Sequence, residues 1–141
     1  MSYGSETRMW TPITPAGDVI PNPRQGACMV NDSRTLYIIG GRTDNIFTNA
    51  VWAFDLGTYE YEMLKYGGIG APIPGANYNC LIRGEKIIVL NGESYGTTPL
   101  IDVHEYDIID NSWKHIMSCN KAKNLASVID LGDKILTLGG Q

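Results

Sequence analysis

An apolar run that ends in glycine recurs three times along the chain, and this repeat constrains the fold more than any other feature. The last glycines of the three runs are Gly41, Gly92 and Gly140, which lie 51 and 48 residues apart. A fixed period of about 50 residues is typical of arrays in which each small unit packs on its neighbours. The period therefore predicts a row of similar units.

A second series of residues repeats with the same period. Three large aromatic residues are spaced by 51 and 52 residues, and each follows another aromatic residue by seven positions. Because two independent series share one period, the repeat is not a chance match. We expect Trp10, Tyr61 and Trp113 to be largely buried at equivalent places between units. The three pairs are Tyr3 and Trp10, Phe54 and Tyr61, and Tyr106 and Trp113.

The segments between these residues predict four antiparallel strands in each unit. Apolar residues make up 43% of the chain and charged residues 18%, with 16 glycines and 7 prolines, which favours an all-β fold with many turns. Gly84 and Gly132 supply the positive φ that hairpin turns need. The predicted strands are Ala27–Val30, Leu36–Ile39, Ala50–Phe54 and Tyr59–Leu64, then Tyr78–Ile82, Ile87–Leu90, Val103–Tyr106 and Trp113–Met117, and finally Ala126–Ile129 and Ile135–Leu138.

The repeated residues resemble the kelch family of β-propellers. The family pattern is an apolar strand that ends in two glycines, then an aromatic–aspartate pair, then a tryptophan about seven residues later. This chain departs from the pattern at Asn91, which replaces a glycine, and at Tyr61, which stands where tryptophan is usual. The resemblance implies a β-propeller segment of four-stranded antiparallel blades. Its structural residues would be Gly40, Gly41, Gly92, Gly139, Gly140, Trp10, Tyr61 and Trp113.

The resemblance divides the whole chain, residues 1–141, into parts of blades. We expect residues 1–14 to supply the fourth strand of a preceding or closing blade, 24–64 and 76–117 to form two blades, and 124–141 to form the first half of a further blade. Propellers have about four to eight blades, so we expect an incomplete ring. Met1 directly before a strand suggests a natural N-terminus. Either the chain is a segment of a longer protein, or copies self-associate through exposed blade edges.

Charge and cysteine content limit the partners and the compartment. The net charge of −4 argues against nucleic acid and against an anionic membrane, and no apolar run is long enough to cross a bilayer. Three cysteines without a signal peptide predict a reducing, cytoplasmic setting. We expect Cys28 and Cys80 to be repeat counterparts that pack as small apolar residues, and Cys119 to be accessible.

Few residues are candidates for catalysis. His104 and His115 fall on paired strands, where two imidazoles could share a metal, but no carboxylate or thiol stands at a ligand spacing beside them. We interpret them as ordinary strand residues. The segment 67–70 is rich in glycine, but the third glycine of a dinucleotide-binding pattern is missing and no helix follows. We therefore expect no metal, no cofactor and no enzymatic activity.

The resemblance favours a binding module whose partner is another protein. Kelch propellers mostly bind through the loops that enter the first strand of a blade and those that join its second and third strands. Two alternatives stay open: an enzyme whose catalytic residues lie partly outside this segment, and a scaffold that polymerises through blade faces. In this chain the loops mix aromatic and charged residues, as recognition surfaces do. The candidate partner-binding residues are Arg24, Arg42, Asp44, Asn45, Tyr66, Glu93, Ser94 and Tyr95.

Overall fold

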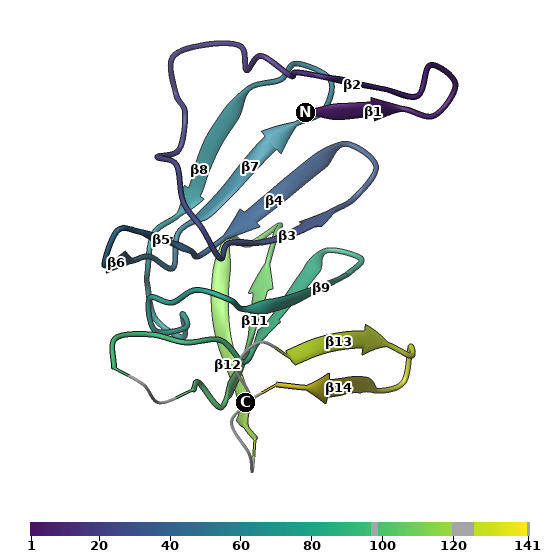
Figure 1. The fold of residues 1–141 in the computed structure, drawn as a ribbon. Coiled ribbons are helices and arrows are strands. Elements are labelled where there is room, and N and C mark those ends of the chain that lie inside the picture. The colour runs from purple at the N-terminus through teal and green to yellow at the C-terminus, as the bar shows by residue number, and fades with distance from the viewer. Residues whose placement is uncertain (97–98, 120–125, 141) are drawn as a thin grey trace.

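The structure, a computed structural model, describes residues 1–96, 99–119 and 126–140. Every regular element among these residues is a β-strand, and the paired strands are antiparallel. The sheets follow one another in a row from the N-terminal strands to the C-terminal ones (Figure 1). The prediction of an all-β propeller segment is confirmed. In the described part of the chain, no helix is long and apolar enough to span a membrane.

Two of the sheets have four strands, and we call them the first blade and the second blade. Each strand pairs with the next strand of the same blade, which gives the orders β3-β4-β7-β8 and β9-β10-β11-β12. The observed bounds lie within two residues of the predicted ones. The strands are β3 (Cys28–Asn31), β4 (Thr35–Ile39), β7 (Val51–Asp55), β8 (Tyr61–Lys65), β9 (Asn79–Arg83), β10 (Lys86–Leu90), β11 (Asp102–Asp107) and β12 (Ser112–Ser118).

A β-bulge interrupts the outer strand pair of both blades at the same place in the repeat. The register shifts between Val51 and Trp52 in the first blade, and between Val103 and His104 in the second. A bulge leaves one residue unpaired and increases the local twist of the strand. The two blades therefore share this β-bulge as well as their regular strands.

The N-terminal strands correct one prediction. The expectation of a lone fourth strand in residues 1–14 is wrong, because the segment forms a hairpin of β1 (Ser2–Gly4) and β2 (Met9–Thr11). The polar residues between them turn the chain back, with Arg8 at a φ of 56° and its amide donating to the carbonyl of Gly4. Tyr3 lies directly opposite Trp10.

The aromatic pairs identify this hairpin as the third and fourth strands of a blade. In all three units the two aromatic residues lie directly opposite each other on paired strands. Their ring centroids are 5.2, 4.7 and 5.1 Å apart in chain order. The sequence spacing of seven is thus the spacing that places two residues opposite each other across the turn between the third and fourth strands.

The C-terminal hairpin supplies the other half of a blade, the first and second strands. It consists of β13 (Ala126–Asp130) and β14 (Ile135–Gly139), which correspond to the first and second strands of a blade. A bidentate ion pair attaches it to the second blade, with Arg83 Nε and Nη2 donating to the two carboxylate oxygens of Asp130 at 2.8 and 2.6 Å. This ion pair, followed by the Gly132 amide, lowers the pKa of Asp130 to about 2.

A titration tests this attachment. Above the ordinary carboxyl pKa of about 3.9 the ion pair is present, and it is lost as the pH falls through about 2. We expect the Asp130 carboxyl carbon to titrate near pH 2 by nuclear magnetic resonance, and Arg83→Ala to raise that midpoint toward 3.9. Lys134→Ala is the control, because no ion pair between Lys134 and Asp130 is found in the described part. If the titration midpoint of Asp130 were the same in the wild type and in Arg83→Ala, the hairpin would not be held by this ion pair.

The hydrophobic core lies between the facing surfaces of the two blades. It is closed by the fully buried ring of Tyr106 and by Trp113, which is 7% exposed. Burial raises the pKa of the Tyr106 hydroxyl to about 12. The first blade contributes Cys28, Tyr37, Ile39 and Val51 to this core, and the second blade contributes Ile87, Val89, Tyr106 and Trp113.

The expected burial of the aromatic series holds for only one member. Trp113 is buried, Tyr61 is half-buried, and Trp10 is 66% exposed. In the second blade the aromatic pair lies on the face turned toward the first blade, so a complete sheet covers it. The pair of the first blade is on the face of its sheet opposite to the core shared with the second blade, and β1 and β2 form the neighbouring sheet on that side (Figure 1). No described sheet precedes Trp10, so the prediction that it is buried is wrong for this chain.

The cysteines correct a second prediction. Cys28 and Cys80 are joined as a disulfide across the two blades, with Cα atoms 6.1 Å apart. They are not repeat counterparts, because Cys28 pairs with Ile39 and Cys80 with Val89, which puts them one residue out of step. A shift of one residue moves a side chain to the other face of a strand. The two sulfur atoms therefore face each other across the interface. The cytoplasmic location stays a prediction.

Candidate functional site

The predicted partner-binding loops lie at one end of the two blades, which we call the loop face. Because the strands are antiparallel, the second and fourth strands end on the same side, and the loops that follow them share it. In the first blade, the loop after β4 folds into a small hairpin of β5 (Arg42–Thr43) and β6 (Ile46–Phe47). Asp44 and Asn45 are exposed at its tip, and Asp44 adopts a φ of 53°.

The loops of the two blades touch each other on this face. The rings of Phe47 and Tyr95 meet edge to face with centroids 4.9 Å apart. The Tyr95 hydroxyl also accepts a hydrogen bond of 3.1 Å from the Phe47 amide. Tyr95 nevertheless stays 62% exposed. Tyr95 is one of the predicted partner-binding residues and Phe47 is not, because the only sequence signal at Phe47 is an aromatic residue in a predicted loop.

A groove of about 320 Å³ opens beside the hairpin. Two predicted residues, Arg24 and Tyr66, line it, and Tyr66 is 71% exposed. The Arg24 guanidinium donates to the carbonyls of Asn22 and Gly40, and burial lowers its pKa. The groove thus combines one held cation with apolar walls. Its other large side chains are Ile46, Phe47, Trp52 and Met63.

Two of the predicted residues, Ser94 and Glu93, make hydrogen bonds that support the loops. Ser94 is buried, and its hydroxyl donates to the carbonyl of Pro74 at 2.6 Å, so its assignment to the recognition surface is wrong. Glu93 is half-buried and accepts from the Asn77 side-chain amide at 2.8 Å. The short polar side chain of Ser94 satisfies a loop carbonyl that water would otherwise have to reach. Arg42 is half-buried, and the binding role of the remaining residues stays a prediction.

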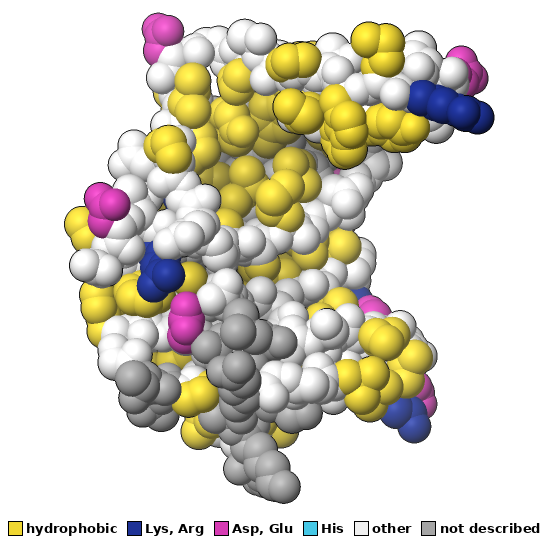
Figure 2. All heavy atoms as spheres, in the orientation of Figure 1, with side chains coloured by type: hydrophobic (Ala, Val, Ile, Leu, Met, Phe, Trp, Pro, Cys, Tyr) yellow, Lys and Arg dark blue, Asp and Glu magenta, His cyan; other side chains and the backbone are white. Residues whose placement is uncertain are grey.

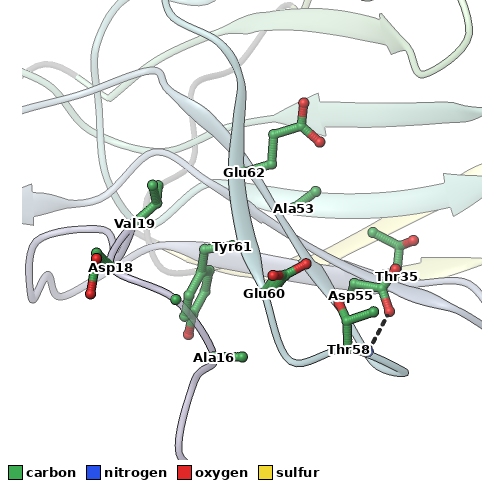
Figure 3. Close-up of a pocket in the computed structure, with 11 residues that line it drawn as sticks. Ala16, Asp18, Val19, Thr35, Ala53, Asp55, Thr58, Glu60, Tyr61 and Glu62 are labelled. Atoms are coloured by element: carbon green, nitrogen blue, oxygen red, sulfur yellow. Dashed lines mark hydrogen bonds between the residues drawn. The ribbon is translucent and has the colours of Figure 1, made fainter.

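An acidic cavity of about 450 Å³ lies away from the loop face, at the outer edge of the first blade (Figure 3). The segment around Ala16 lies beside the residues that lead into β8, with the Ala16 amide donating to the Tyr59 carbonyl at 2.7 Å. The Asp55 carboxylate accepts from the amides of Thr58 and Gly57, which lowers its pKa. No pattern in the sequence points to this cavity, because its lining comes from segments far apart in the chain. Its acidic residues are Asp18, Asp55, Glu60 and Glu62.

The two histidines lie on one face of the second blade. His104 is opposite His115, with ring centroids 5.2 Å apart. His104 Nδ1 is 2.8 Å from the Gly70 carbonyl oxygen, which can only accept, so Nδ1–H donates there, and burial lowers the pKa of the ring. His115 Nε2 is 3.1 Å from an oxygen of Asp102. Within the described ranges no group of three or more His, Cys, Asp or Glu residues could hold a metal ion. The expected absence of a metal stays a prediction.

Comparison with known proteins agrees with the repeat geometry. The family model described as the KLHDC2/KLHL20/DRC7 Kelch-repeats domain matches residues 1–140. Kelch domain-containing protein 10 of Homo sapiens is 29% identical over 99 residues, which cover 68% of this chain and 22% of that protein. Kelch domain-containing protein 3 of Mus musculus is 29% identical over 119 residues, covering 82% and 30%. The chain spans less than a third of the length of these relatives. It belongs to the kelch-repeat family, whose members are generally protein-interaction modules.

Proposed function

We propose that this chain binds another protein through the loop face. The observation that carries the proposal is the contact between Phe47 and Tyr95, which ties the loops of two blades into one surface. A surface held in place before binding loses little conformational entropy when a partner docks. Around it stand large exposed side chains, Ile46 at 70% and Tyr66 at 71%, beside the positive charge of Arg24.

The composition of the groove defines the partner segment. Aromatic and apolar walls favour a partner that inserts an apolar side chain. The Arg24 guanidinium at the rim favours a carboxylate next to it, because arginine pairs with carboxylates in bidentate geometry. We therefore propose a protein segment with an apolar residue beside an acidic one. Nothing in the described part favours a catalytic role over this one, and kelch relatives are generally not enzymes.

Two isoleucines of nearly equal exposure, Ile46 and Ile109, provide the test. Ile46 is 70% exposed on the loop face, and Ile109 is 68% exposed in the turn between β11 and β12, at the opposite end of the blades. We expect Ile46→Asp to weaken partner binding by on the order of tenfold or more, because it puts a charge into an apolar contact. Ile109→Asp should leave the affinity unchanged.

The wild-type chain, Ile46→Asp and Ile109→Asp each serve as bait for affinity capture. Titration calorimetry then measures the affinity of the captured protein for each of the three. A partner held by the wild-type chain and by Ile109→Asp, and released by Ile46→Asp, supports the loop face. A partner released by Ile109→Asp and retained by Ile46→Asp would place binding at the other end and overturn the proposal.

A further inference from the structure

A second groove opens on the loop face, beside the loop that joins β10 and β11. It has a volume of about 430 Å³, and we call it the second-blade groove. The groove beside the β5–β6 hairpin is the first-blade groove. Loops of both blades form the second-blade groove, because one wall comes from the segment between β8 and β9 and the other from the segment before β11. Its apolar walls are Ile73, Tyr95, Pro99, Leu100 and Ile101.

The two grooves take the same place in the repeat. Val51 pairs with the last residue of β4, and Val103 pairs with the last residue of β10, so these two valines are equivalent. Ala50, directly before Val51, lines the first-blade groove, and Asp102, directly before Val103, lines the second-blade groove. The wall of each groove therefore begins where the third strand of its blade begins.

One kind of hydrogen bond supports both grooves. The Thr43 hydroxyl donates to the carbonyl of Pro23 at 2.6 Å beside the first-blade groove. The Ser94 hydroxyl donates to the carbonyl of Pro74 at 2.6 Å beside the second-blade groove. In each blade a hydroxyl side chain shortly after the second strand holds the segment that leads into the first strand. The fold thus builds one groove of the same kind on each blade.

The two grooves differ in the charge that they carry. Arg24 lines the first-blade groove, whereas Asp102 lines the second. Asp102 Oδ1 accepts from the Ser118 hydroxyl at 2.6 Å and lies 3.1 Å from His115 Nε2, and these bonds lower the pKa of the carboxyl. Among the residues that the structure describes, none bonds to Asp102 Oδ2, and the side chain is 33% exposed. The second-blade groove therefore presents a carboxylate to a partner.

The grooves are close enough for one partner segment to reach both. Phe47 lines the first-blade groove and Tyr95 the second, and their rings are in contact with centroids 4.9 Å apart. An extended chain advances about 3.3 Å per residue, so a few residues cross this contact. The loop after β10 lies on the same side as β5 and β6 (Figure 1). Side chains of both charges stand among hydrophobic ones on that side (Figure 2).

We propose that the second-blade groove binds an apolar residue beside a lysine or arginine of the same partner segment. The inference rests on the proposed function, in which the first-blade groove binds an apolar residue beside an acidic one. The carboxylate of Asp102 pairs with the basic residue, and the Arg24 guanidinium with the acidic one. The reversed placement puts like charges together at both grooves, which disfavours it. The two charges thus set how the segment lies across the loop face.

Selection from random twelve-residue peptides displayed on phage tests this, with the 141-residue chain as bait. We expect the enriched peptides to carry an acidic residue and a lysine or arginine, with apolar residues between them. Selection on Asp102→Asn should keep the acidic residue and lose the basic one, because asparagine retains an acceptor oxygen but no charge. Asp110→Asn is the control, because it removes an exposed carboxylate from the turn between β11 and β12, at the opposite end of the blades.

A synthetic peptide from the wild-type selection then measures the pairing by calorimetry. Replacement of its basic residue by norleucine should weaken binding to the wild-type chain by about threefold to tenfold, and should leave the affinity for Asp102→Asn unchanged. Ile101→Lys is a second variant, which adds a positive charge to an exposed wall of the groove and leaves the bonds of Asp102 in place. It should weaken the basic peptide more than the norleucine peptide. Circular dichroism verifies that each variant is folded.

The outcomes separate this inference from the proposed function. Enriched peptides with acidic and apolar residues but no basic one would overturn the inference and leave the proposed function standing. The same holds for a basic residue whose contribution neither Asp102→Asn nor Ile101→Lys changes. Peptides that bind Ile46→Asp as tightly as the wild type would overturn the proposed function instead. A selection that enriches no sequence would count against both.

Discussion

Gly40→Ala is expected to destabilise the paired blades by about 2–5 kcal/mol. Gly40 has a φ of 71°, and an alanine in this left-handed region costs about 1–2 kcal/mol. Its Cβ would also lie 2.5 Å from the ring of Tyr78 and 2.9 Å from the Gly75 carbonyl oxygen. Overpacking of this kind costs about 1–3 kcal/mol more, because backbone on one side leaves the ring little room to move.

Gly84→Ala separates the two costs. Gly84 has a φ of 58°, and a Cβ there meets no atom within 4 Å. We expect this variant to lose only the conformational part, about 1–2 kcal/mol. Urea denaturation at one protein concentration measures both free energies of unfolding. Equal losses in the two variants would mean that the space beside Tyr78 does not constrain Gly40.

The side chain of Tyr78 leaves no room for a Cβ at three nearby glycines. A Cβ on Gly40, Gly75 or Gly92 would lie within 3 Å of the Tyr78 side chain in every case. The ring is buried, which raises the pKa of its hydroxyl, and the hydroxyl donates to the carbonyl of Ile73. The departure at Asn91 is explained by its φ of 60°, which asparagine tolerates better than most residues.

Trp113→Ala is expected to cost about 3–5 kcal/mol of stability, because it removes a large side chain from the interface between the blades. The indole packs 5.1 Å from the Tyr106 ring and 6.4 Å from the His104 ring, measured between centroids. Partial collapse of the site cannot refill this space, since complete sheets hold both sides.

Trp113→Phe is the matched variant. The indole Nε1 of Trp113 is buried and has no hydrogen-bond partner among the described residues, so phenylalanine gives up no hydrogen bond to them. We expect a loss of about 1–2 kcal/mol, from the smaller apolar area alone. The same urea titrations measure it. If Trp113→Ala cost no more than Trp113→Phe, the residue would not be the wedge between the blades.

Sequence predicted the features that repeat. The strands of both blades followed from apolar runs, glycine turns and one period, because these are local and each was seen at least twice. The spacing of seven between Tyr106 and Trp113 was visible in the sequence, and the structure shows that it places the two residues opposite each other on paired strands. The loop positions of Tyr66 and Tyr95 followed from the strand order, although their use in binding stays a prediction.

The sequence did not predict the features that depend on which sheets lie next to a residue or on the direction of its side chain. Trp10 matches Trp113 in the repeat, yet its burial depends on a sheet that no local pattern reveals. Cys28 and Cys80 face each other because of a shift of one residue, which a spacing of 52 residues does not resolve. Ser94 looks like any polar loop residue until its hydrogen bond to Pro74 is seen.

The bulges at Val51 and Val103 bear on how such a row of sheets avoids aggregation. They lie in the pairs that hold β8 and β12, the outermost strands of the two blades. A twisted edge is a poor template for a stray strand, whereas a flat one invites fibrils. By contrast, β1–β2 and β13–β14 pair in continuous register. Among the described residues, the fold thus twists the outermost strand of each complete blade, which makes that edge a poor site for pairing with another chain.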